Sequence, residues 1–200
     1  MIVGVFGLPG AGKTTFLTKC AYKWTHGKKF MGIPPADIVL TNFDCPNCYK
    51  LDFDSLGKFN FHHMNILIDE IMLFADCRNF KTFSEDLKAF FALHRRSHVN
   101  VVWCSQSYRD CDIKIRNLTE KFFLLECGKI LSMFSFAKPI YHVMNVKSDE
   151  IQDRYILGAP LEWVPVFRPR YYSMFDSYES KLKLLPDPEL IPWQQPNYQK

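Results

Sequence analysis

Short apolar runs recur through the first two thirds of the chain, and polar residues or glycines follow each of them. These runs span Ile2 to Phe6, Asp37 to Thr41, Met64 to Ile68, Asn100 to Ser105 and Lys121 to Cys127. Their apolar residues are continuous rather than alternating, which is typical of strands covered on both faces. We therefore expect these runs to be the strands of a mainly parallel sheet.

Two stretches between the runs carry helical patterns. Residues Phe16 to Trp24 follow the first strand, and His26-Gly-Lys-Lys29 then supplies the basic residues and glycine that commonly end a helix. Thr82-Phe-Ser-Glu85 has the spelling of a capping box that opens a helix. The next residues place one helical face at Leu87, Phe90, Phe91 and His94. Strands that alternate with helices predict an α/β fold, with a parallel sheet flanked by helices.

The last third of the chain has a different pattern. Ile130 to Phe136 and Ile140 to Val146 are the pattern of two paired strands, which we expect to extend the sheet in antiparallel fashion. Proline and aromatic residues become frequent after Gly158. We expect one domain over residues 1–180 and a Pro-rich C-terminal tail over residues 181–200.

A complete phosphate-loop motif joins the first strand to the first helix. The stretch Gly7-Leu-Pro-Gly-Ala-Gly-Lys-Thr14 matches G-x-x-x-x-G-K-[ST], and a strand before it with a helix after it is the context that this motif needs. The motif predicts a P-loop NTPase. The residues that we expect to bind the nucleotide are Gly7, Leu8, Pro9, Gly10, Ala11, Gly12, Lys13, Thr14 and Thr15.

The residue types of the loop account for this chemistry. Its glycines let the backbone curl so that N–H groups point at phosphate oxygens, and the helix N-terminus adds partial positive charge. We expect Lys13 to reach the β- and γ-phosphates and the Thr14 hydroxyl to hold Mg²⁺. Because the chain shows no guanine-reading N-K-x-D motif, ATP is favoured over GTP.

Polar residues at the ends of two later strands complete the predicted catalytic set. Asp69 and Glu70 end the apolar strand that begins at Met64, and the carboxyl ends of parallel strands meet at one edge of the sheet. We expect Asp69 to orient Mg²⁺ and Glu70 to act as general base toward water. Gln106 ends the next strand and is a candidate contact to the γ-phosphate or the attacking water; an ordinary polar strand end is the alternative.

The candidate arginine fingers lie in later segments. A guanidinium presents a planar fork of donors that matches phosphate oxygens. Arg95 is our first choice, Arg116 the second and Arg96 the third, with Arg109 as a further candidate. The alternative for each is a surface or DNA-facing charge.

Composition sets broad limits. Hydrophobic residues make up 48% of the 200, and the net charge of +4 is compatible with a polyanionic partner without pointing to one. The seven cysteines are odd in number and irregularly spaced, which favours free thiols in a reducing compartment. Cys45-Pro-Asn-Cys48 is the spacing of half a zinc site, with a redox pair or free loop thiols as the alternatives. No run approaches the roughly 18 apolar residues of a membrane helix.

The order of these motifs resembles a known family. The phosphate loop is followed by Thr41-Asn42-Phe43, Ile68-Asp69-Glu70, His94-Arg95-Arg96, Ser105-Gln106, Ile115-Arg116 and Tyr172-Ser-Met-Phe-Asp-Ser177. This order resembles the N-terminal domains of zonula occludens toxin (Zot), which are similar to the assembly ATPases of filamentous phages. Both belong to the FtsK–HerA-like P-loop ATPases. The resemblance covers roughly residues 1–180.

The resemblance implies a five-stranded core in which the Gln106 strand lies beside the phosphate-loop strand. It also implies an ATPase that uses Mg-ATP to move viral DNA in virion extrusion or capsid packaging. The family works as a ring, with a hexamer favoured, in the host cytoplasm at the inner membrane and with a membrane-anchored assembly partner. The alternatives are a nucleotide-dependent switch or scaffold, and a small-molecule kinase.

Overall fold

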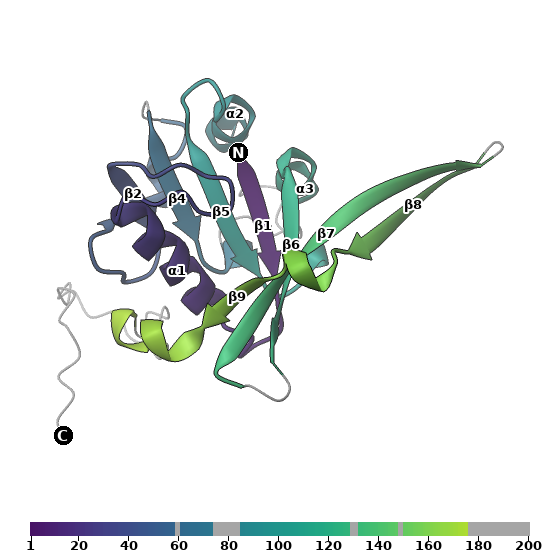
Figure 1. Cartoon of the computed structure of the whole chain (residues 1–200). Coiled ribbons are helices and arrows are strands. Elements are labelled where there is room, and N and C mark those ends of the chain that lie inside the picture. Colours follow the sequence, from purple (N-terminus) through teal and green to yellow (C-terminus); the bar gives the residue numbers. More distant parts are fainter. Residues whose placement is uncertain (59–60, 74–84, 129–131, 148–149, 176–200) are drawn as a thin grey trace, which may run out of the picture.

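A single mixed sheet runs through the computed structural model, which describes residues 1–58, 61–73, 85–128, 132–147 and 150–175 (Figure 1). Within these residues the sheet has nine strands in the order β3-β2-β4-β5-β1-β6-β7-β8, and β9 also pairs with β7. The parallel strands are β1 (Ile2–Phe6), β2 (Ile38–Thr41), β3 (Tyr49–Lys50), β4 (Met64–Ile68), β5 (Asn100–Ser105) and β6 (Lys121–Cys127). The antiparallel strands are β7 (Phe134–Lys147), β8 (Glu150–Leu157) and β9 (Val164–Phe167).

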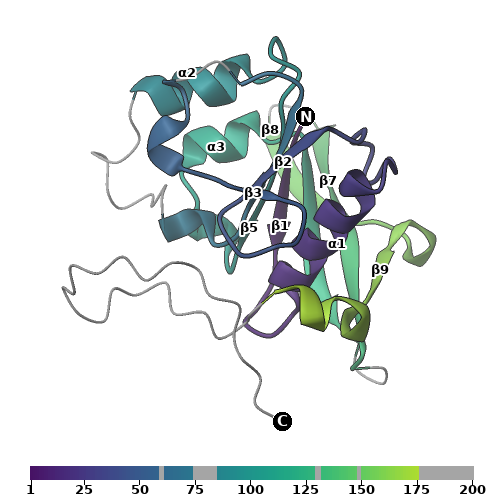
Figure 2. The ribbon, with the colours of Figure 1, turned by 90° about the vertical axis from the view of Figure 1, so that its left-hand side faces the viewer.

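Helices cover both faces of the parallel part. Helix α1 (Lys13–Thr25) packs on one face, and α2 (Glu85–Leu93) and α3 (Ile113–Leu118) pack on the other (Figure 2). Short 3₁₀ turns are η1 (Phe53–Ser55), η2 (Ile71–Leu73), η3 (Tyr108–Asp110), η4 (Pro160–Glu162) and η5 (Arg168–Met174). The turn η5 returns to α1 and packs against it.

The sheet separates two hydrophobic clusters. Phe16 and Trp24 of α1 pack against one face, and Phe91 of α2 and Ile115 of α3 pack against the other, around Trp103. The helical face expected from residues 87–94 is buried at all four positions, Leu87, Phe90, Phe91 and His94. Because both faces are covered, the core strands are continuous apolar runs, as their sequence indicated.

The predicted sheet is confirmed in its central part. The strands β2, β4, β5, β1 and β6 form five parallel neighbours, and β5 lies between β4 and the phosphate-loop strand β1. Helix α1 begins at Lys13, inside the phosphate-loop motif and three residues earlier than expected. Of the predicted capping box, Thr82 lies outside the described residues. The predicted tail over residues 181–200 lies outside them too.

The prediction of two paired strands over Ile130 to Phe136 and Ile140 to Val146 was wrong. One strand, β7, begins at Phe134 and runs from the end of the first segment through the whole of the second, and it pairs with β6 on one side and with β9 and β8 on the other. Pro139 does not break it, because it stands between the part paired with β9, which ends at Ala137, and the part paired with β8, which begins at Ile140. At this junction a missing N–H removes no ladder bond, and the Pro139 carbonyl still accepts from Gly158 at 2.7 Å.

Beyond β6 the strands β7 and β8 leave the body as a long two-stranded arm (Figure 1). The antiparallel extension that we expected is therefore present, although its pairing differs. In the described ranges no helix has both the length and the hydropathy needed to cross a bilayer.

Candidate nucleotide-binding site

The phosphate loop connects the end of β1 to the start of α1 at the carboxyl edge of the sheet. Gly10 and Gly12 have φ of 78° and 92°, which a residue with a side chain adopts only at a cost. Gly12 is also the N-cap of α1, and no side chain caps the helix there. The first backbone N–H groups of α1 are therefore left to an outside acceptor, which is the arrangement that binds phosphate.

Lys13 is buried in this loop and faces a carboxylate. Its Nζ donates to the Gly7 carbonyl at 3.0 Å and lies 3.5 Å from Glu70 Oε1. Gln106 Nε2 donates to the same Glu70 oxygen at 3.4 Å. The first residue of α1 and the residues that follow β4 and β5 thus meet at one point at the carboxyl edge of the sheet.

Glu70 reaches this position through an unusual backbone conformation. Its φ of 50° is in the left-handed region, which is rare for a residue with a side chain and costs about 1–3 kcal/mol. The next residues form the turn η2, in which Leu73 N–H donates to the Glu70 carbonyl at 3.0 Å. Strain of this kind persists where the surrounding structure holds a side chain for a purpose, here toward Lys13.

Asp69 is linked to the loop and to a neighbouring strand. The Thr14 hydroxyl donates to Asp69 Oδ2 at 2.6 Å, so the two residues predicted to hold Mg²⁺ lie together. The Asn42 side chain bonds the Asp69 backbone twice, donating from Nδ2 to the carbonyl and accepting at Oδ1 from the N–H, both at 2.7 Å. Asn42 belongs to the Thr41-Asn42-Phe43 motif of the family resemblance, which predicts no role for its side chain. The available signal was that it follows β2 directly, as Asp69 follows the adjacent strand β4.

These side chains fit a metal-bound nucleotide. Asp69 Oδ1 and Glu70 Oε2 are buried and have no hydrogen-bond partner among the described residues. Buried carboxylate oxygens are costly unless they are paired. Hydroxyl and carboxylate oxygens are the ligands that Mg²⁺ prefers, and Thr14 and Asp69 supply both. The open backbone donors and Lys13 match phosphate oxygens.

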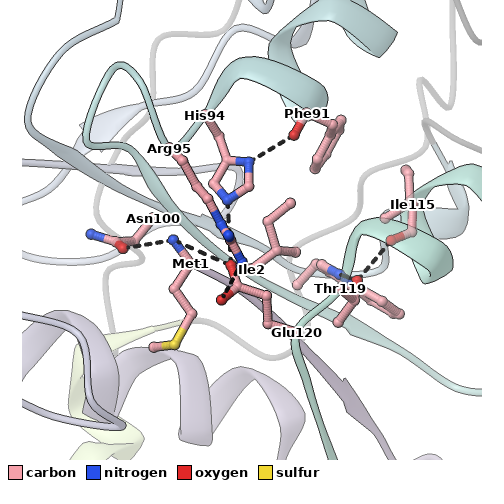
Figure 3. Close-up of polar contacts among 10 residues, drawn as sticks. Met1, Ile2, Phe91, His94, Arg95, Asn100, Ile115, Thr119 and Glu120 are labelled. Atoms are coloured by element: carbon pink, nitrogen blue, oxygen red, sulfur yellow. Dashed lines mark hydrogen bonds and ion pairs between the residues drawn. The ribbon is translucent and has the colours of Figure 1, made fainter.

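Two of the predicted arginines lie away from this cluster. Arg95 lies at the opposite, amino edge of the sheet, where its Nη2 is 3.1 Å from Glu120 Oε2 (Figure 3). Arg116 lies on α3, with its guanidinium 4.5 Å from the Tyr108 ring centre. Neither arginine has a hydrogen bond or ion pair with the phosphate loop in the described part of the chain. Within one subunit, neither is brought to the site.

A different arginine lies beside the loop. Arg168, the first residue of η5, would have its Nε 3.6 Å from a Cβ placed on Gly12. It is more than 150 positions from the loop in sequence, and the order of motifs gave no signal for it. The position after a strand end, here that of β9, was the one available indication.

The Cys45 and Cys48 thiols lie beyond β2, and a hydrogen bond joins them. This bond is the main cause that lowers the pKa of Cys48, against the opposing effect of burial. The same bond and burial raise the pKa of Cys45 far above its ordinary value. Among the described residues, no group of three His, Cys, Asp or Glu side chains gathers to hold a metal ion. The two thiols therefore lack further ligands within that part of the chain.

The parallel sheet, the loop and the cluster at its carboxyl edge define the chain as having a P-loop NTPase fold. No protein-family profile matches the chain, and no curated protein sequence matches it. Solved structures do match. The N-terminal domain of zonular occludens toxin from Neisseria meningitidis has a TM-score of 0.52 at 14% identity, over 88% of this chain and 98% of that one. At this identity the likeness shows a shared fold.

Two other solved structures are similar at lower scores. The genome packaging NTPase B204 from Sulfolobus turreted icosahedral virus 2, in complex with ATP-gammaS, has a TM-score of 0.47 at 13% identity, over 64% of this chain and 75% of that one. The flagellar accessory protein FlaH from Methanocaldococcus jannaschii has a TM-score of 0.46 at 11% identity, over 76% and 88%. The likeness to the zonular occludens toxin domain confirms the fold expected from the Zot resemblance.

Proposed function

We propose that this chain hydrolyses Mg-ATP and uses the energy to move viral DNA during virion assembly. The observation that carries the hydrolytic part is the meeting of Lys13, Glu70 and Gln106 beside two buried carboxylate oxygens that have no hydrogen-bond partner among the described residues. The DNA-moving part rests on the order of motifs shared with the Zot and phage-assembly ATPases, and the shared fold supports it.

Each residue of the cluster has a definite role in this proposal. The loop amides and Lys13 bind the β- and γ-phosphates, and Lys13 offsets charge on them. Glu70 accepts a proton from the attacking water, and Gln106, bonded to Glu70, orients that water. Thr14 and Asp69 would hold Mg²⁺, which supplies positive charge to the phosphate oxygens when bound.

The remaining parts of the proposal concern assembly. Arg95 and Arg116 do not reach the site of their own subunit, so an arginine finger from either must act in a neighbouring subunit of a ring, for which we favour a hexamer. An arginine finger is worth roughly 10³–10⁵ in rate, so isolated subunits are expected to hydrolyse slowly. We place the ring in the host cytoplasm, at the inner membrane beside a membrane-anchored partner.

The test is ATP hydrolysis across a protein-concentration series, with and without single- or double-stranded DNA. We expect a rate that rises steeply with concentration and with DNA. Lys13→Ala and Glu70→Gln should each lower it by at least roughly 10²-fold, and Glu70→Gln should still bind ATP. Lys23→Ala, which removes a lysine from the last turn of the same helix, is the matched control and should hydrolyse like wild type.

The outcomes separate the alternatives. A hydrolysis rate per subunit that depends neither on protein concentration nor on DNA would contradict the proposed DNA-moving motor. Tight nucleotide binding without turnover would instead favour a switch or scaffold, and phosphoryl transfer to an added acceptor would favour a kinase. Arg95→Ala and Arg116→Ala identify the finger: the correct variant loses the concentration-dependent part of the rate, and mixing it with Lys13→Ala restores activity.

A further inference from the structure

The antiparallel extension folds back onto the phosphate loop. Ser135 of β7 is fully buried, and its hydroxyl donates to the Ala11 carbonyl at 2.7 Å. Lys19 of α1 donates to the Pro165 carbonyl of β9, which ties the extension to the helix that carries the loop. A Cβ on Gly12 would lie 2.9 Å from Ser135 Oγ, so the extension and the loop are in close contact.

Arg168 brings a positive charge into this contact. Its backbone N–H donates to the Met133 carbonyl at 2.8 Å, which fixes the start of η5 beside β7. Its Nη1 has two acceptors, Cys127 Sγ at 3.3 Å and the Ser132 carbonyl at 3.4 Å. The bond to the carbonyl is long, and sulfur is a weak acceptor.

The rest of the guanidinium lacks a strong partner. Arg168 Nε is buried and has no hydrogen-bond partner among the described residues, and no carboxylate in that part of the chain forms an ion pair with it. A partly buried cation without an anion is costly. The side chain is also held in place, because its guanidinium carbon lies 5.8 Å from the Tyr172 ring centre. An anion at this point would satisfy the unpaired charge.

The sheet order shows which end of a nucleotide lies there. Glu70 and Gln106 follow β4 and β5, on one side of the loop strand β1, and they mark the γ-phosphate end. Arg168 lies on the other side, beside the ends of β6 and β7. Because Lys13 reaches the β- and γ-phosphates, a cation on the far side of Gly12 faces the nucleoside end. The anionic group at that end is the α-phosphate.

We propose that Arg168 is a nucleotide-binding residue of the same chain that contacts the α-phosphate. This inference rests on the proposed function, since it needs a nucleotide in the phosphate loop. It differs from an arginine finger in two respects. It acts within its own subunit, and it does not distinguish a nucleoside triphosphate from a diphosphate.

The experiment measures dissociation constants of ATP and ADP by calorimetry for wild type, Arg168→Ala and Arg168→Lys. A charge-assisted contact to the α-phosphate predicts that Arg168→Ala weakens both nucleotides by the same factor, roughly 10- to 100-fold, and that Arg168→Lys loses less. Arg170→Ala is the matched control, because Arg170 bonds the Tyr22 hydroxyl on the exposed side of α1. It should bind like wild type.

The readings are distinct. A loss confined to ATP would place Arg168 at the γ-phosphate and overturn the inference, as would unchanged binding of both nucleotides. Binding lost in Lys13→Ala and kept in Arg168→Ala would leave the proposed function standing. If wild type bound neither nucleotide, the proposed function itself would fall. The melting temperature without ligand shows whether each variant folds. If Arg168→Ala folds too weakly for calorimetry, the measurement is made on Arg168→Lys instead, as the shift in melting temperature that saturating ADP produces.

Discussion

Both edges of the parallel sheet carry buried or partly buried carboxylates, but these carboxylates have different surroundings. At the amino edge, the Glu120 carboxylate accepts the Ile2 N–H at 3.2 Å and lies 3.1 Å from Arg95 and 3.5 Å from the His94 ring (Figure 3). At the carboxyl edge, Asp69 and Glu70 each keep one buried oxygen without a partner among the described residues.

This difference in pairing indicates that the carboxylate of the amino edge stabilises the fold, whereas those of the carboxyl edge are available to a ligand. Protein groups surround the carboxylate of the amino edge, so its interactions hold the starts of β1 and β6 together and need no ligand. At the carboxyl edge some carboxylate oxygens lack partners among the described residues, although the backbone there is fixed. Glu70 has a left-handed φ, and two hydrogen bonds from the Asn42 side chain hold the Asp69 backbone. The two buried carboxylate oxygens at the carboxyl edge are costly without a partner, and a bound metal ion or ligand would supply one.

The largest expected effect separates the edges by activity. Asp69→Asn should lower ATP hydrolysis by roughly 10²–10³-fold, because it removes the charge beside Thr14 that would hold the metal. Its melting temperature without ligand should stay near that of wild type, since the amide can still accept from Thr14. Asp37→Asn, an exposed change at the amino edge, is the control. Wild-type turnover by Asp69→Asn would remove the carboxyl edge as the active site.

The second effect concerns the frame of the site. Asn42→Ala removes both hydrogen bonds to the Asp69 backbone, so we expect a loss of about 1–3 kcal/mol in the free energy of unfolding. Hydrolysis should fall by roughly 10- to 10²-fold as Asp69 moves. Urea unfolding and steady-state rates measure the two quantities. Asn42→Asp keeps the acceptor but places a carboxylate oxygen against the Asp69 carbonyl, so it should also be less stable than wild type. Equal stability of wild type and both variants would contradict the role of Asn42.

The third effect tests the amino edge. Glu120→Gln should lower the free energy of unfolding by about 1–2 kcal/mol, because the carboxylate interactions with the Ile2 N–H and with Arg95 weaken together. Nucleotide affinity and the hydrolysis rate per folded subunit should not change. Urea unfolding with parallel calorimetry provides the measurement. A loss of ATP binding without a loss of stability would mean that this edge also belongs to the site.

The smallest effect is a pH dependence at the amino edge. Burial is the main cause that lowers the pKa of His94 below its ordinary value of 6.5, although Glu120 and the Phe91 carbonyl oppose it. The neutral ring is thus favoured in the folded chain, and its contribution is fully present above pH 6.5. As pH falls below 6.5 the unfolded chain takes up a proton that the folded chain resists, so stability decreases.

We expect His94→Gln to reduce this slope of stability between pH 7 and pH 5. The exposed His62→Gln is the control and should keep it. Urea unfolding at a series of pH values gives the slope directly. If His94→Gln and wild type lost stability in parallel over this range, the pH dependence would have another source.

Local sequence patterns were sufficient to predict the strands of the core and the residues that lie at their carboxyl edge. The strands β1, β2, β4, β5 and β6 are continuous apolar runs, and parallel strands bring their following residues to one edge, which placed Lys13, Glu70 and Gln106 together. Residues whose roles depend on packing between distant segments were not predictable in this way. Arg168 reaches the loop only because β9 pairs with β7. The continuity of β7 through Pro139 was not predictable either, because a proline normally indicates the end of a strand.

The continuity of β7 has a mechanical consequence. This strand is bonded to the phosphate loop through Ser135 near one end, and its other end, at Lys147, lies far out in the arm (Figure 1). At about 3.3 Å per residue the two points are roughly 40 Å apart. The pairing with β6 ends at Ile140, and the strand extends roughly 23 Å beyond it, so a tilt of five degrees there would displace the far end by about 2 Å. The single strand β7 therefore connects the phosphate loop directly to the outer end of the arm.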